Sequence, residues 1–136
     1  MINNLAVKDH SLKMFPKGAV VFPKTGKSCA KGNIGRLNGD SYVVNHLAVV
    51  YDENELNLDF LYYFLEYYNT SNLIPAQSGY PTINLSDIKK LKIPLIDKPL
   101  KEKIVKDLKD IDLDNKKNKK ELKENYLKNY FEKKYI

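Results

Sequence analysis

The sequence predicts an α+β fold, in which a small mixed β-sheet unit with one packed, aromatic-rich helix precedes a long C-terminal helix of coiled-coil type. The chain up to residue 97 is interrupted by Gly, Pro and Asn and alternates short β-branched runs with one helical stretch. Residues 100–134 contain no Gly or Pro and are rich in Lys, Glu, Asp and Leu. We therefore divide the chain into a compact domain, 1–97, and a helical region, 98–136.

Composition excludes several classes of protein. The chain has 136 residues, a hydrophobic content of 43% and a net charge of +6, which is typical of a globular domain with a basic surface. The chain has a single cysteine, Cys29, which excludes an internal disulfide. Because it also has only two histidines, we expect no metal site. No apolar stretch is long enough to span a bilayer, so we expect a cytoplasmic protein.

The first half of the compact domain carries the strand signals. Residues 19–22 form a β-branched run that ends at Pro23. Asn38-Gly39 predicts a hairpin turn that leads into a strand over 41–51. Apolar residues occupy both faces of that strand, so we expect it to be buried on both sides, with His46 inside the core.

One helix and a short helical turn complete the compact domain. The apolar spacing predicts a helix over 57–68 with Asn57 as N-cap, and its aromatic side chains are expected in the core. A polar loop follows and re-enters as extended chain at 81–83. Ser86 then caps a helical turn over 87–90.

The C-terminal region predicts one helix of about 50 Å. Its apolar residues recur at spacings of three and four, interrupted by a polar run over 114–121. Such a helix buries too little apolar surface to be stable alone, so we expect it to pack on another helix. The predicted helix-pairing residues are Ile104, Leu108, Ile111, Leu122 and Tyr126.

No complete catalytic constellation is present. Gly26-Lys27-Ser28 resembles the end of a phosphate-binding loop, but Val21 stands where that motif needs glycine. Cys29 and His46 are the only nucleophile and base that a thiol enzyme would use, and nothing local except nearby lysines would lower the pKa of the thiol. We predict no catalytic residue and no cofactor, and hence a binding protein that is not an enzyme.

Two polar loops carry the functional prediction. Residues 1–50 hold seven basic and two acidic side chains, which suits either a polyanionic partner or an ordinary lysine-rich solvated surface. Hydroxyl, amide and ammonium groups at the loop following Pro23 and the loop around Gly79 are the groups that contact DNA phosphates and base edges. The predicted DNA-binding residues are Lys24, Thr25, Lys27, Ser28, Arg36, Gln77, Ser78, Tyr80 and Thr82.

The order of these features resembles a known family. The segments that carry the resemblance are FPKGAVVFPKTGKS, GDSYVVNHLAVVYD, LDFLYYFLE, SGYPTINLSDIKKLKIPL and the helical tail from LKEKIVKDLKD onward. In this order they resemble the specificity subunit of type I restriction–modification enzymes. The resemblance implies that residues 1–97 are part of a DNA-reading target recognition domain and that 98–136 correspond to a helical spacer.

The resemblance also implies partners. These are double-stranded DNA, of which each recognition domain reads one half of a split target, the methyltransferase subunits that dock on the spacer, and a restriction subunit. A second recognition domain, or a second copy of this chain, would pair through the C-terminal helix. The family has more chain before the segment matching GAVVF, which leaves open a truncated product, a half-subunit that dimerises or a recombining segment. Two other functions also stay open: a scaffold that does not read DNA, and an enzyme using Cys29 or Lys27.

Overall fold

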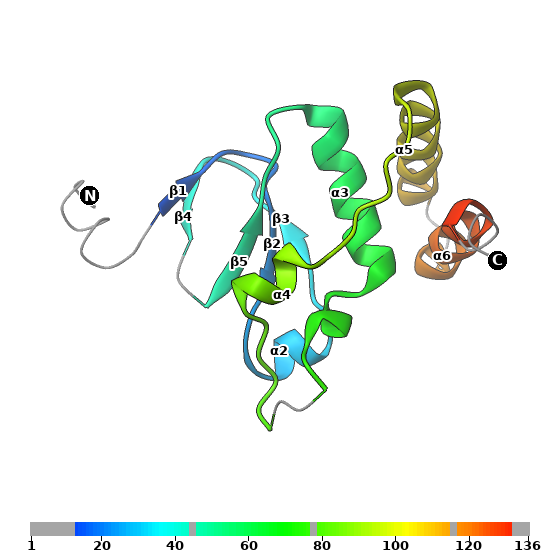
Figure 1. Ribbon diagram of the computed structural model, residues 1–136. Coiled ribbons are helices and arrows are strands. Elements are labelled where there is room, and N and C mark those ends of the chain that lie inside the picture. The colour runs from blue at the N-terminus through cyan, green and yellow to red at the C-terminus, as the bar shows by residue number, and fades with distance from the viewer. Residues whose placement is uncertain (1–12, 44–45, 77–78, 115–116, 132–136) are drawn as a thin grey trace. The chain divides into compact units, whose positions relative to one another are not determined.

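The computed structural model describes residues 13–43, 46–76, 79–114 and 117–131 (Figure 1). The chain divides into two compact units, residues 1–93 and 94–136. Helices and short strands together make the fold α+β, as predicted. Every helix within the described ranges is too short or too polar to span a bilayer.

A bent antiparallel ribbon opens the first unit. Strand β1 (Lys13–Phe15) pairs with β4 (Ser41–Val43), and β2 (Val20–Pro23) pairs with β3 (Gly35–Arg36). The two pairs share one register, so the ribbon is a single structure that bends where Pro16, Lys17 and Gly18 interrupt it. The Gly18 N–H donates to the Leu37 carbonyl at 2.9 Å and carries the pairing across the bend.

The hairpin predicted at Asn38-Gly39 is therefore wrong. Strands β3 and β4 flank this dipeptide, but they pair with β2 and β1 and not with each other. Gly39 does not have the positive φ that a two-residue hairpin turn requires. The long-range pairing with residues 13–21 outweighs the local turn signal.

Strand β5 (Leu47–Val50) pairs with β2 and completes a three-stranded sheet of order β3-β2-β5. The prediction of one strand over 41–51 is wrong, because its two ends belong to different sheets. Ala48 is the buried residue of β5, so this strand is not buried on both faces, and His46 is exposed rather than in the core. All the pairings described are antiparallel, so the sheets are not mixed.

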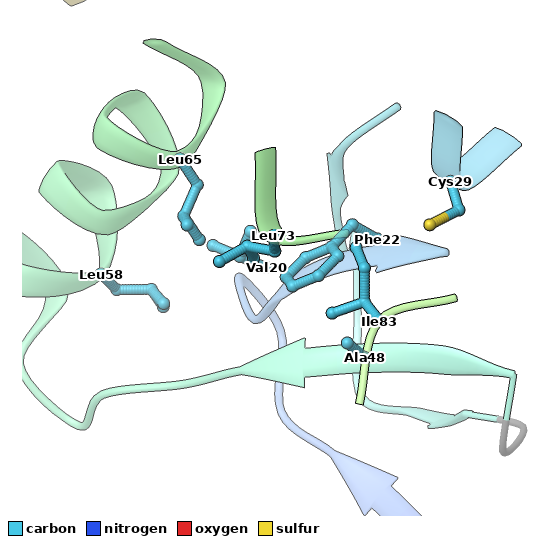
Figure 2. Packing of buried hydrophobic residues seen from close by; sticks show 8 residues of the cluster. All are labelled: Val20, Phe22, Cys29, Ala48, Leu58, Leu65, Leu73 and Ile83. Carbon is cyan, nitrogen blue, oxygen red and sulfur yellow. The ribbon is translucent and has the colours of Figure 1, made fainter. Parts of the chain in front are cut away.

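Helix α3 (Glu55–Tyr68) packs on β2. Its N-cap is Asn54 and not Asn57, since the Asn54 side chain accepts from the Asn57 N–H at 3.1 Å. Phe60 and Phe64 are buried, which confirms that the aromatic side chains of this helix belong to packing. The core cluster lies between α3, the sheet and the segments around them, and consists of Val20, Phe22, Cys29, Ala48, Leu58, Leu65, Leu73 and Ile83 (Figure 2).

The chain beyond α3 closes this core. A 3₁₀ turn, η1 (Thr70–Leu73), follows directly, and α4 (Leu85–Lys89) comes later, with Asn84 and not Ser86 as its N-cap. The Asp87 carboxylate accepts from the Asn84 N–H at 2.8 Å. Ile83 places this segment in the core cluster.

Thr70 offers a test of the core energetics. Its side chain is 1% exposed, and its hydroxyl has no hydrogen-bond partner within the part of the chain that the structure describes. We expect Thr70→Val to raise the free energy of unfolding by about 1 kcal/mol, because an isosteric methyl group removes the cost of an unsatisfied buried hydroxyl. Urea unfolding measures the change. Thr70→Ser keeps the hydroxyl and removes the methyl group, so it should destabilise; a stabilising Ser variant would contradict the assignment.

Within its described residues, the second unit has two helices where the sequence predicts one. Helix α5 (Lys98–Leu113) ends at Asp114, whose backbone is extended, and α6 (Lys119–Phe131) packs against α5. In a continuous helix, the polar run over 114–121 would bury no apolar surface and so would not stabilise the helix. The turn between α5 and α6 instead lets the apolar residues of α6 pack on α5. The predicted length of about 50 Å is therefore wrong, since α5 measures about 24 Å. The packing of α5 on α6 does not confirm the predicted coiled-coil character of the C-terminal region, which stays a prediction.

The buried positions of this pair partly match the predicted seam. Ile104 and Leu108 are buried, while Ile111, Leu122 and Tyr126 are only half-buried. Their use in pairing with a partner helix stays a prediction. On α5 the additional buried residue is Val105; on α6 the buried residues are Lys123, Leu127 and Phe131.

Polar bonds fix the register of α5 against α6. The ammonium of Lys123 lies 2.8 Å from a carboxylate oxygen of Asp112, and the Tyr126 hydroxyl donates to the carboxylate of Asp107. The bond from Tyr126, followed by the one from Lys103, lowers the pKa of Asp107. Burial, followed by the bond to Asp107, raises the pKa of the Tyr126 phenol.

The Asp107 bond predicts a pH dependence. Because the pKa of Asp107 is lowered in the folded chain, its contribution to stability is present above the ordinary value of 3.8 and is lost as the pH falls through the lowered value. We expect Tyr126→Phe to move the pKa of Asp107 up toward 3.8 and to weaken this acid dependence, because it removes the largest cause of the shift. A carbon-detected NMR titration of Asp107 measures it. Lys103→Gln should give a smaller rise, and the reverse order would contradict the assignment.

Candidate nucleic-acid interface

The first predicted loop is in fact a short helix at the end of β2. Helix α2 (Gly26–Ala30) begins directly after Thr25, where the sequence predicted irregular chain. Gly26 has a φ of +82°, and a Cβ at this position would lie 3.3 Å from the Tyr80 hydroxyl. Glycine therefore permits both the sharp entry into the helix and the close approach of Tyr80.

Backbone hydrogen bonds join this helix to the second predicted loop. The Gly26 N–H donates to the Pro81 carbonyl at 3.0 Å, and the Ile83 N–H donates to the Lys24 carbonyl at 2.7 Å. Between these bonds Thr25 and Thr82 face each other as an antiparallel bridge. Residues 24–28 and 79–82, which we call the joined loops, thus form one structure although fifty residues separate them in the chain.

The joined loops present polar groups to solvent. Thr25, Lys27, Ser28 and Tyr80 are exposed, Tyr80 by 64%, whereas Lys24 and Thr82 are half-buried. Hydroxyl and ammonium donors held on a hydrogen-bonded backbone suit contacts with phosphates and base edges. Gln77 and Ser78, which the sequence also predicted to bind DNA, lie outside the described residues.

The C-terminal end of α2 is anchored by a contact that the sequence analysis missed. Gly32 has a φ of +71°, and a Cβ added there would lie 2.0 Å from Oδ1 of Asn69. Asn69 is the C-cap residue of α3 and has a φ of 68°, and its Oδ1 accepts from the Ser71 N–H and hydroxyl. The one signal in the sequence for this contact is Gly32 itself, a residue type that permits a positive φ. This contact sets the joined loops near the C-terminal end of α3.

Arg36 lies in a different environment from the other predicted DNA-binding residues. Its Nη1 donates to Oδ1 of Asp59 at 2.7 Å, its Nε donates to the Gly18 carbonyl at 3.0 Å, and its guanidinium carbon lies 5.7 Å from the centre of the Tyr62 ring. The Asp59 side chain is 7% exposed, so this ion pair ties the ribbon to α3 from a buried position. The sequence signal for this ion pair is Asp59 itself, a charged residue between Leu58 and Phe60 on a part of α3 that is buried. A DNA contact from Arg36 stays a prediction.

Cys29 is part of the core and not of a catalytic site. It is 1% exposed, its sulfur is directed into the cluster of Figure 2, and burial raises the pKa of its thiol. A buried neutral thiol is a poor nucleophile, and His46 is exposed on the chain before β5. This geometry disfavours the thiol enzyme that the sequence left open. Among the described residues, no group of three or more His, Cys, Asp or Glu side chains is arranged to hold a metal ion.

Comparison with known proteins gives a consistent result. The family described as type I restriction modification DNA specificity domain matches residues 2–125. A similar protein is the type I restriction enzyme MjaIX specificity subunit of Methanocaldococcus jannaschii, which is 30% identical over 124 residues. The alignment covers 81% of this chain and 28% of the relative. The chain therefore spans just over a quarter of the length of the curated relative that it matches.

Proposed function

The chain belongs to the family of type I restriction–modification DNA specificity domains, and from this premise we propose that its joined loops read one half of a split DNA target. Specificity subunits of such systems are not catalytic, in agreement with the prediction that the chain is not an enzyme. The observation that carries the proposal is the hydrogen-bonded junction of residues 24–26 with 81–83. It brings together the two segments whose side chains are chemically suited to DNA.

The junction supports reading rather than mere attachment. Base readout requires donors that stay in place. The backbone hydrogen bonds between residues 24–26 and 81–83 fix the stretches of backbone next to the Thr25 and Tyr80 side chains. Lys27 and Ser28 lie on the same short helix and suit phosphate oxygens, which set the position of a protein on the duplex. Lys24 and Thr82 complete the set at the half-buried edge, and Gln77 and Ser78 stay within the proposal.

For the second unit, we propose a role in assembly. The α5–α6 pair corresponds to the spacer of the specificity subunit and would dock the methyltransferase subunits, to which a restriction subunit is added. Pairing with a second recognition domain or a second copy would use the half-buried residues Ile111, Leu122 and Tyr126. The proposed location of this assembly is the cytoplasm.

The test of reading uses the full chain assembled with methyltransferase subunits. Mapping which adenines become protected identifies the target, and binding is then compared on duplexes with and without it. We expect Tyr80→Ala and Thr25→Ala to lower the affinity for the target about tenfold or more while leaving non-target binding nearly unchanged, because base contacts carry the discrimination. Lys27→Gln should weaken binding to both duplexes by a similar factor, because a phosphate contact carries no sequence information.

Lys17→Gln is the matched control, since Lys17 is an exposed lysine at the bend of the ribbon, outside the joined loops and outside α5 and α6. Unchanged target affinity in all three variants of the joined loops would contradict the proposal. A scaffold that does not read DNA is the alternative. It predicts a binding constant with almost no dependence on salt, whereas a DNA-binding chain shows a steep one.

A further inference from the structure

Helix α4 and the residues after it present three lysines to solvent. Lys89, Lys90 and Lys92 are all exposed. The apolar residues among them, Ile88 and Leu91, pack against the core cluster. Ile88 and Leu91 thus face the core, whereas the three lysines face solvent.

The same core holds α2. Cys29 of α2 and Ile83, which lies two residues before α4, are members of one cluster (Figure 2). Ile83 is also the residue whose N–H bonds to Lys24. The elements that carry Lys27 and Lys31 and those that carry the α4 lysines are therefore fixed to one part of the unit, as the positions of α2 and α4 in Figure 1 illustrate.

Charge is segregated within this unit. Residues 51–68, which include α3, hold five acidic and no basic side chains, whereas residues 24–32 hold three lysines and no acidic residue. In residues 79–92 the one acidic residue is Asp87, and its carboxylate caps the start of α4. A polyanion is therefore attracted to the α2 and α4 elements and repelled by the acidic segment.

We propose that Lys89, Lys90 and Lys92 form a second DNA contact, which binds backbone phosphates beside the joined loops and supplies affinity that does not depend on sequence. The inference rests on the proposed function and adds to it a surface with no part in base readout. Three ammonium groups on one short stretch match successive phosphates, and each neutralised phosphate releases condensed counterions.

The test measures how the binding constant depends on salt, using the full chain and a random-sequence 30-bp duplex. The variant Lys89→Gln/Lys90→Gln/Lys92→Gln removes the charges and keeps a polar, unbranched side chain at each position. We expect the slope of log K against log salt to become shallower by about 2 to 3, since each phosphate contact contributes about 0.9. Circular dichroism and thermal unfolding confirm that the variant is folded. The control variant Lys106→Gln/Lys120→Gln/Lys128→Gln makes the same change in net charge on exposed positions of α5 and α6.

The outcomes are distinguishable. An unchanged slope in a folded α4 variant, with wild-type binding intact, overturns this inference and leaves the proposed function standing. An equal fall in both variants also overturns it, because the effect is then one of net charge. A wild-type chain with no measurable affinity for the random duplex overturns this inference alone, because the proposed function is decided by target binding of the assembled chain. A selective loss in the α4 variant, of the same size on target and random duplexes, supports the phosphate contact.

Discussion

Replacing Arg36 with alanine is expected to lower the free energy of unfolding by about 3 kcal/mol, because it removes the guanidinium from a buried carboxylate. The side chain of Asp59 is 7% exposed, compared with 29% for Arg36. Asp59→Ala should therefore cost less, about 2 kcal/mol, since water can partly solvate the remaining guanidinium. Urea unfolding followed by circular dichroism measures both changes.

Two further variants separate the ion pair from packing. Arg36→Met/Asp59→Leu should recover most of the lost stability, because well-packed apolar residues often replace a buried ion pair at little cost. Glu53→Ala, a change at an exposed carboxylate just before α3, should stay within about 0.5 kcal/mol of the parent chain. If Arg36→Ala proved as mild as Glu53→Ala, the ion pair would not anchor the ribbon to α3.

The second large effect is expected at Gly32. Alanine there places a methyl group 2.0 Å from Oδ1 of Asn69. It also puts a residue with a Cβ atom at a backbone φ of +71°, which such residues rarely adopt. Asn69 cannot move aside without losing its bonds to Ser71, at 3.1 and 2.7 Å. We expect Gly32→Ala to lower the free energy of unfolding by about 3 kcal/mol, from backbone strain and the displaced cap together. Thermal or urea unfolding measures the loss.

The controls for Gly32 lie in the same unit. Gly39→Ala adds a methyl group to open space at an ordinary backbone conformation, so it should be neutral or slightly stabilising. Gly32→Ala/Asn69→Gly removes the steric clash but keeps the strain at position 32, and it should recover only part of the loss. Equal stability of Gly32→Ala and Gly39→Ala would show that the close approach of Asn69 does not constrain the chain.

Local patterns in the sequence predicted the class of the elements well. The 3.6-residue spacing of apolar side chains predicted the helix that became α3, and the β-branched run over 19–22 predicted β2 nearly to the residue. Both signals depend on burial of one face of the element, and the spacing of apolar residues along the chain shows which face that is. The aromatic side chains of α3 were assigned to packing for the same reason, and Phe60 and Phe64 are buried.

Signals that depend on a partner far away in the chain were misjudged. Asn38-Gly39 satisfied the rule for a hairpin, yet the flanking strands pair with residues 13–21 and leave the dipeptide in an open bend. Residues 100–134 satisfied the rule for one helix, yet the polar run permits a turn after which α6 packs on α5. In both cases the tertiary contact contributes more free energy than the local preference.

The candidate site divides in the same way. Residue types along the chain predicted candidate DNA contacts, because hydroxyl and ammonium groups near Gly and Pro mark exposed polar loops. The folded chain was needed to show that residues 24–26 and 81–83 form one hydrogen-bonded structure, and that Arg36 pairs with Asp59. The physical reason is that composition and periodicity report on neighbours along the chain, whereas a backbone bond or a buried ion pair joins groups whose distance depends on the whole fold.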